Sequence, residues 1–147
     1  MAAAGGVASL MIVVTKAIII VLLISSWDVI VVRAYDGTVR EFRCNPTHYD
    51  DDPMNQEITM ITNSLIRETQ PGPPPASLCV APDRGDDQPD VWGWAACAER
   101  LTKDDCGRCL EGARNSLMQY YCPGRAGAHV YRRDCSLQYE TYDICNQ

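Results

Sequence analysis

The stretch Cys97–Cys109, CAERLTKDDCGRC, contains three cysteines and decides how the second half of the chain folds. Thr102, followed three positions later by an acidic residue, is close to the capping box that begins an α-helix. Residues three apart on a helix are neighbours, so Cys106 and Cys109 share a face. Cys106 lies in the first turn and can reach back to Cys97, at the end of the preceding predicted strand. Cys109 lies one turn deeper and needs a partner from another element.

A C-x-x-C pair also occurs in zinc sites and in redox centres, so the other cysteines matter. The chain has eight cysteines, all after residue 34, and only two histidines. An even number of cysteines in a small secreted chain indicates a disulfide framework. A zinc site would need reduced thiolates or histidines in a closed set, in competition with oxidation. We therefore expect disulfides, no metal and no cofactor, with the pairing left open by the spacing: Cys44, Cys79, Cys97, Cys106, Cys109, Cys122, Cys135 and Cys145.

The first 34 residues have the layout of a secretory signal peptide. Lys16 precedes the apolar run AIIIVLLISS, which ends in a polar break. The alternative is a membrane span over residues 7–32, which would bury Lys16 and Asp28 at a cost of roughly 2.5–3.5 kcal/mol each. We favour a cleaved signal, a secreted domain at residues 35–147, and no stable membrane insertion after cleavage.

The charge of the chain argues against one class of partner. The net charge is −6, and loss of the leader makes it more negative because Lys16 and Arg33 are removed with only Asp28. Nucleic-acid binding needs a basic surface against phosphates. We therefore expect no nucleic-acid partner.

Hydrophobic periodicity predicts two helices in the domain. Asp52 is the expected N-cap of the first, with Pro53 at the first helical position and an end before Pro71. The apolar stripe of that helix is Met54, Ile58, Ile61 and Leu65. The second helix runs from near Thr102 to Pro123, and its apolar side is Cys106, Cys109, Leu110, Ala113 and Leu117.

Strands are expected around these helices, at residues 38–44, 78–81, 91–97, 127–133 and 135–145. Trp92 and Trp94 share one face of the third strand, and we assign them to core packing in preference to stacking on sugars. The order of elements predicts an α+β domain in which two helices cover one face of a largely antiparallel sheet.

Several motifs together carry a family resemblance over residues 39–142. They are the C-x8-C-x2-C spacing, RCNPT at residues 43–47, YYC at residues 120–122 and GAHVYRRDCSLQYE at residues 127–140. The domain resembles the ginkbilobin-like plant cysteine-rich secreted domain of the salt stress response/antifungal family. The resemblance implies two helices on a five-stranded antiparallel sheet. It also implies the disulfides Cys44–Cys122, Cys97–Cys106 and Cys109–Cys135, and by subtraction we hypothesise a fourth, Cys79–Cys145.

The resemblance further implies a mannose site made of an Asn, an Arg and a Glu. The Asn falls on Asn45 and the Glu on Glu140, and an amide beside a carboxylate suits sugar hydroxyls. The Arg position is occupied by His129, which predicts weaker binding or a pH dependence near about 6.5. Arg133, about 13 Å further along the predicted strand, is a distant substitute.

Each of these residues also has a structural interpretation that the sequence leaves open. Asn45 suits a turn beside Pro46, Glu140 suits a solvated strand position, and a single histidine such as His129 is often structural.

The resemblance implies a secreted, mannose-binding antifungal lectin of plant defence, with fungal mannan as the ligand class. The alternative is an apoplastic protein-interaction module of the same fold, with little sugar binding and with cell-surface proteins as partners. An enzyme is not expected, because no nucleophile partner for either histidine and no paired carboxylates for glycoside hydrolysis can be identified.

Overall fold

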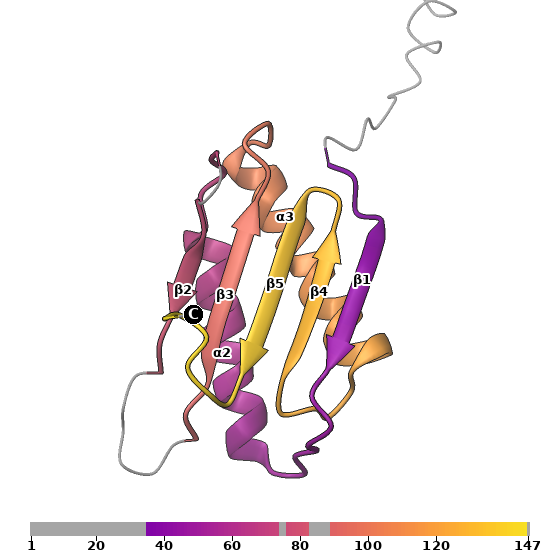
Figure 1. Ribbon diagram of the computed structural model, residues 1–147, viewed down its shortest axis with the longest axis vertical. Helices are drawn as coiled ribbons and strands as arrows, with labels where there is room; N and C mark the ends of the chain where they lie inside the picture. The colour runs from indigo at the N-terminus through magenta and orange to yellow at the C-terminus, as the bar shows by residue number, and fades with distance from the viewer. Residues whose placement is uncertain (1–34, 74–75, 83–88, 147) are drawn as a thin grey trace, which may run out of the picture. The chain divides into compact units, whose positions relative to one another are not determined.

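The computed structural model describes residues 35–73, 76–82 and 89–146, and the predicted signal at residues 1–34 lies outside this part (Figure 1). Its two α-helices are α2 (Asp52–Glu68) and α3 (Lys103–Ser116), the latter continued by a π-helical turn, η1 (Leu117–Tyr121). The strands are β1 (Val39–Cys44), β2 (Leu78–Val80), β3 (Trp92–Cys97), β4 (Ala128–Arg132) and β5 (Cys135–Glu140).

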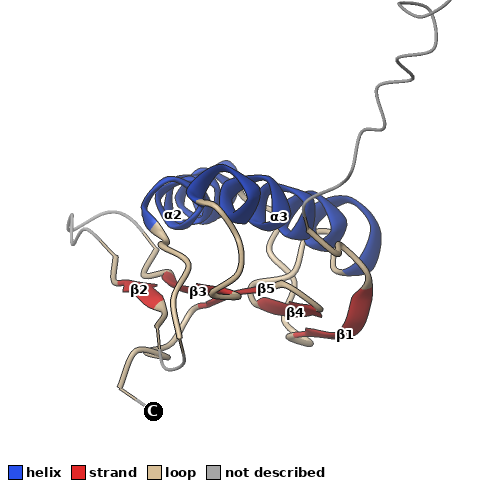
Figure 2. Cartoon of the chain, turned by 90° about the horizontal axis from the view of Figure 1, so that it is seen from above, coloured by secondary structure: helices blue, strands red, loops and turns tan. Residues whose placement is uncertain are grey.

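The five strands form one antiparallel sheet in the order β1-β4-β5-β3-β2. Both helices lie on the same face of this sheet, and no helix of the described residues covers the other face (Figure 2). The predicted fold class is confirmed. The face without helices is called the open face below.

The first helix begins one residue earlier than its sequence indicates. Asp51, not Asp52, is the N-cap, and its Oδ1 accepts a hydrogen bond from the Met54 N–H at 3.1 Å. Three consecutive aspartates lie around the start of the helix, and Asp51 is the N-cap because its carboxylate reaches the N–H of Met54. The predicted apolar stripe is confirmed, because Ile58, Ile61 and Leu65 are buried in the core.

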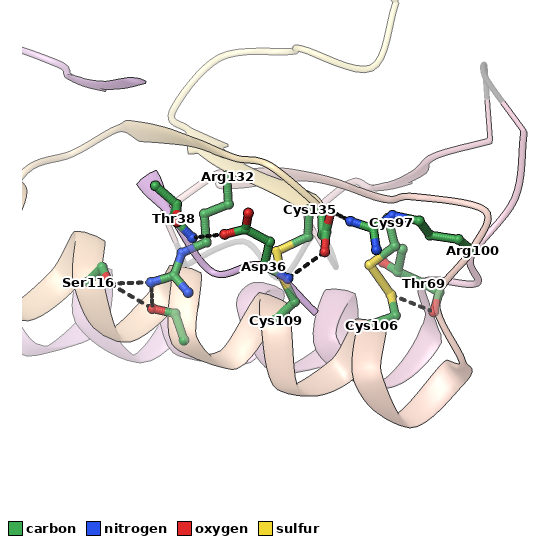
Figure 3. Close-up of a disulfide and its surroundings, with 12 residues drawn as sticks. Asp36, Thr38, Thr69, Cys97, Arg100, Cys106, Cys109, Ser116, Arg132 and Cys135 are labelled. Atoms are coloured by element: carbon green, nitrogen blue, oxygen red, sulfur yellow. Dashed lines mark hydrogen bonds and ion pairs between the residues drawn. A yellow bond between two sulfur atoms is a disulfide. The ribbon is translucent and has the colours of Figure 1, made fainter. Parts of the chain in front are cut away.

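Two disulfides fasten α3 to the middle of the sheet (Figure 3). The predicted cap is confirmed, since the Thr102 Oγ1 accepts from the Asp105 N–H at 3.1 Å. Cys97 of β3 and Cys135 of β5 are directly opposite each other in the strand register. Cys97 is bonded to Cys106 and Cys135 to Cys109, so one turn of the helix is joined to two neighbouring strands.

The other two disulfides hold the edges of the domain. Cys44–Cys122 joins the end of β1 to the residue after η1. Cys79–Cys145 confirms the hypothesised fourth bridge. The last strand ends at Glu140, however, so Cys145 belongs to a C-terminal segment that lies on the open-face side of the sheet and not to a strand (Figure 2).

The packing of α2 on β3 predicts a large effect of adding one methyl group. A Cβ on Gly93 would overlap Ile61 Cγ2 and would lie 2.9 Å from Leu65 Cδ1. We expect Gly93→Ala to lower the free energy of unfolding by about 1–3 kcal/mol, the usual cost of overpacking. Thermal and denaturant unfolding of the purified protein measure this.

Gly107→Ala is the matched control. A Cβ there would meet only the Ile66 carbonyl oxygen at 3.6 Å, an ordinary contact, in the interior of α3. Because alanine favours a helix over glycine by about 1 kcal/mol, this variant is expected to be as stable as the wild type or more so. Equal stability of the Gly93 and Gly107 variants would contradict the packing described.

Candidate carbohydrate-binding site

The side chains of the open face form three rows that cross the strands. Gly93 and Ala95 of β3 face the helices, as do Val130 of β4 and Leu137 of β5, so alternate residues point the other way. The strand register places these residues side by side. The first row is Asn45, Gly127, Glu140 and Trp92, the second is Arg43, His129, Gln138 and Trp94, and the third is Glu41, Tyr131, Ser136 and Ala96.

The fold brings together two of the predicted ligands, Asn45 and Glu140. The Asn45 Nδ2 donates to the Glu140 Oε2 at 3.1 Å across 95 residues of sequence. The Asn45 Oδ1 also accepts from the Thr47 N–H at 2.9 Å, which is the turn interaction that the sequence left open. Asn45 therefore stabilises its own turn and holds the carboxylate, and these roles do not compete.

Gly127 provides the space in which the Glu140 carboxylate lies. A Cβ at this position would overlap Oε2 of Glu140, so any other residue would displace the carboxylate. The backbone carbonyl of Gly127 also accepts from the Asn45 N–H at 2.8 Å. Gly127 is thus required for the close approach of Asn45 and Glu140, because a side chain at this position would occupy the space in which they meet.

Glu140 is not the solvated strand residue of the alternative interpretation, since only 7% of it is exposed. Burial raises the pKa of Glu140, while hydrogen bonds involving Asn45 and Gln138 act in the opposite direction. Gln138 lies two residues before it on the same face. It is a neighbour that the sequence interpretation missed, although strand alternation alone points to it.

His129 lies one row away from the Asn45–Glu140 pair. It is two residues along the strand from Gly127, which corresponds to about 6–7 Å. Its ring lies 3.9 Å from that of Tyr131 and 6.1 Å, edge-on, from that of Trp94. Its Nε2 is buried and has no hydrogen-bond partner in the described part of the chain.

The surroundings of His129 keep it uncharged. The pKa of His129 is lowered from the usual 6.5 to about 4, mainly by burial and also by the positive charge of Arg43, while the charge of Glu41 opposes this. The expectation of a pH dependence near about 6.5 is therefore wrong, because the imidazole is neutral over the whole range above about pH 5.

Arg43 supplies the positive charge that His129 does not. It is directly opposite His129 in the β1–β4 pairing, and it shares the open face with Asn45 two residues later. Its side chain is 74% exposed and pairs with Glu41 at 2.6 Å. The alternation of residues 41, 43 and 45 is the sequence signal that finds it. Arg133, the substitute suggested by the sequence, lies beyond the end of β4 and pairs with Asp36 at 3.1 Å.

Trp92 and Trp94 also differ from expectation. They share a face as predicted, but that face is the open one, and both are partly exposed. The assignment to core packing is wrong because Gly93 and Ala95 face the helix side, where Gly93 leaves room for Ile61 and Leu65 of α2.

The neutral His129 predicts that acid destabilises the fold through this residue. The unfolded chain takes up a proton near about pH 6.5, whereas the folded protein does so only near pH 4, so stability falls between these values as the pH is lowered. The melting temperature is expected to fall more between about pH 7 and about pH 4.5 in the wild type than in His129→Gln. Thermal unfolding followed by circular dichroism measures both.

His48→Gln serves as the control, because His48 is the second histidine and is exposed. This variant is expected to keep the acid sensitivity of the wild type. Identical pH profiles for the wild type and His129→Gln would show that His129 is not held neutral.

The described residues contain no group of three metal-ligating side chains, and none of their helices is long and apolar enough to cross a membrane.

A search of curated proteins found no match. Among solved structures, the chain is similar in fold to the tandem DUF26 ectodomains of two cysteine-rich receptor-like proteins of Arabidopsis thaliana. For PDLP8 the identity is 21%, the TM-score 0.57 and the coverage 71% of this chain and 46% of that one.

For PDLP5 the identity is 15%, the TM-score 0.61 and the coverage 72% of this chain and 51% of that one. The chain thus spans about half the length of these ectodomains, and the likeness shows the fold alone. The sequence match is with the salt stress response/antifungal family, over residues 43–142. Since this match covers most of the chain, the protein belongs to the salt stress response/antifungal family.

Proposed function

We propose that this chain is a secreted defence protein that binds mannose-containing glycans, such as fungal mannan, without processing them. The observation that carries the proposal is the Asn45–Glu140 pair, in which an amide and a carboxylate from distant parts of the sequence lie 3.1 Å apart on the open face. An amide donor beside a carboxylate acceptor matches two vicinal sugar hydroxyls. The family supports a defence role.

The pair retains hydrogen-bonding capacity for a ligand. Asn45 uses one amide hydrogen on Glu140, so the second remains for a hydroxyl oxygen. A carboxylate has about four lone-pair sites, and bonds from Asn45 and Gln138 leave the others for hydroxyl donors. Hydrogen bonds to a charged carboxylate are about twice as strong as neutral ones, and burial away from water strengthens them further.

Arg43 takes the role that the family resemblance gives to an arginine. Its only ion-pair partner among the described residues is Glu41, and so exposed a pair contributes only about 0–1 kcal/mol. A guanidinium on a long side chain two residues from Asn45 can therefore leave Glu41 and donate to a sugar above the first row. We assign His129 to the packing of the face, beneath this arginine.

Secretion is part of the proposal. Removal of residues 1–34 as a signal peptide delivers the domain to the apoplast, and four disulfides suit an oxidising extracellular compartment. Each bridge contributes about 2–4 kcal/mol to stability, which favours survival outside the cell.

The test is titration calorimetry of the secreted protein with mannose and with mannan fragments. Asn45→Ala is expected to weaken binding about tenfold, the loss of one good hydrogen bond. Arg43→Ala is expected to weaken it by a similar factor with no loss of melting temperature, since the side chain is exposed. Asn115→Ala, on α3, is the matched control and is expected to bind as the wild type does.

Two outcomes would contradict the proposal. Unchanged binding in both Asn45→Ala and Arg43→Ala would place the sugar elsewhere. Absence of binding in the wild type to every mannose-containing glycan would favour the alternative, an apoplastic protein-interaction module.

A further inference from the structure

A recess lies on the open face, at the end where β3 stops and β5 starts. It has a volume of about 660 Å³. One wall comes from residues just before β2 and the other from the turn between β4 and β5, while Trp94 and Ala96 of β3 form its floor. Six of its lining residues carry the argument that follows: Ser77, Trp94, Ala96, Glu99, Arg133 and Ser136.

We infer that this recess is a second sugar subsite, which takes further units of the glycan bound at Asn45 and Glu140. The inference rests on the proposed function and adds that the bound glycan is several sugar units long. Its volume is within the range of about 300–1,000 Å³ that is usual for small-ligand sites. Such sites combine an apolar floor with a few polar groups, which is the arrangement here.

The lining favours a neutral, polyhydroxylated ligand. Trp94 and Ala96 give a flat apolar floor on which the C–H face of a sugar ring can pack. Ser77 and Ser136 add hydroxyl groups at the border. Glu99 and Arg133 bring opposite charges to the rim, so the recess has no single sign that would select an anion or a cation.

Three of the charged lining residues have partners within the fold, and one of them is Arg133, which pairs with Asp36 at 3.1 Å. Arg132 donates to the Gly112 carbonyl oxygen at 2.7 Å and to Ser116, both on α3. Asp134 is buried and accepts from Arg100 and from the Asp36 N–H. Figure 3 shows the Arg132 guanidinium turned toward α3. Arg132 and Asp134 therefore shape the recess, while Glu99 and the Asp36-paired Arg133 lie at its rim.

The two subsites lie on one continuous strip of the open face. Ser136 and Glu140 are both on β5, four residues apart, a separation of about 13 Å. Gln138 lies between them, and Trp94 is its neighbour on β3. A single mannose cannot reach both places, so a chain of several sugars is required to occupy them together.

The C-terminal segment bounds this strip on one side. Cys79 is opposite Trp94 in the β2–β3 register, and its disulfide ties Cys145 to the open face there (Figure 2). The strip therefore runs along β5 instead of spreading across β2. A linear glycan laid along β5 fits this shape.

The test compares mannose with a ladder of mannose oligomers by titration calorimetry. In the wild type the affinity is expected to rise at least about tenfold from mannose to the longest oligomer. Trp94→Ala and the milder Ser136→Ala are expected to remove most of this rise while mannose itself binds as before. Ala96→Leu, which fills the floor and keeps Trp94, is expected to do the same.

Tyr120→Ala is the control, because Tyr120 is 76% exposed on η1, away from the recess. If mannose binds but the affinity does not rise with length, the inference is wrong and the proposed function stands. The same holds if the recess variants weaken mannose and oligomers equally. If the rise with length is seen and Asn45→Ala binds mannose and oligomers as tightly as the wild type does, the recess is a sugar site and the Asn45–Glu140 pair is not. If no sugar binds at any length, both are overturned.

Discussion

The arrangement of the domain depends on two disulfides, which join two cysteines of α3 to one cysteine on each of two neighbouring strands. One turn of α3 carries Cys106 and Cys109, and the strand register sets their partners Cys97 and Cys135 directly opposite each other on β3 and β5. The spacing along a helix turn thus matches the spacing between two paired strands. This fixes the helix over the middle of the sheet and decides which face is the core and which face stays open.

The set of side chains on the open face follows from which face of the sheet the helices cover. Every strand residue that does not point at the helices points outward, so a short sheet brings side chains from distant segments into rows. Asn45 and Glu140 meet because β1 and β5 flank β4, and Gly127 between them carries no side chain. The binding function proposed for this face needs no mobile part and no cofactor.

Much of this fold could be predicted from the sequence, because helical periodicity and cysteine spacing are local signals. Asn45 and Glu140 followed from the family resemblance. The family resemblance could not identify Arg43, because Arg43 and His129 become neighbours only through the pairing of β1 with β4. The orientation of Trp94 could not be predicted for a related reason. Strand alternation shows that Trp94 and Trp92 share a face, but it does not show which face of the strand packs against a helix.

The central claim is that one face of the sheet is structural and the other binds a glycan. Two-dimensional amide and indole NMR spectra of the purified protein, recorded during titration with a mannose oligomer, test it most directly. Binding on the open face is expected to shift the signals of the Asn45 side-chain amide, of Arg43 and of the Trp94 indole, with little change along α2 and α3. Shifts confined to the helices, or none at saturating glycan, would contradict it.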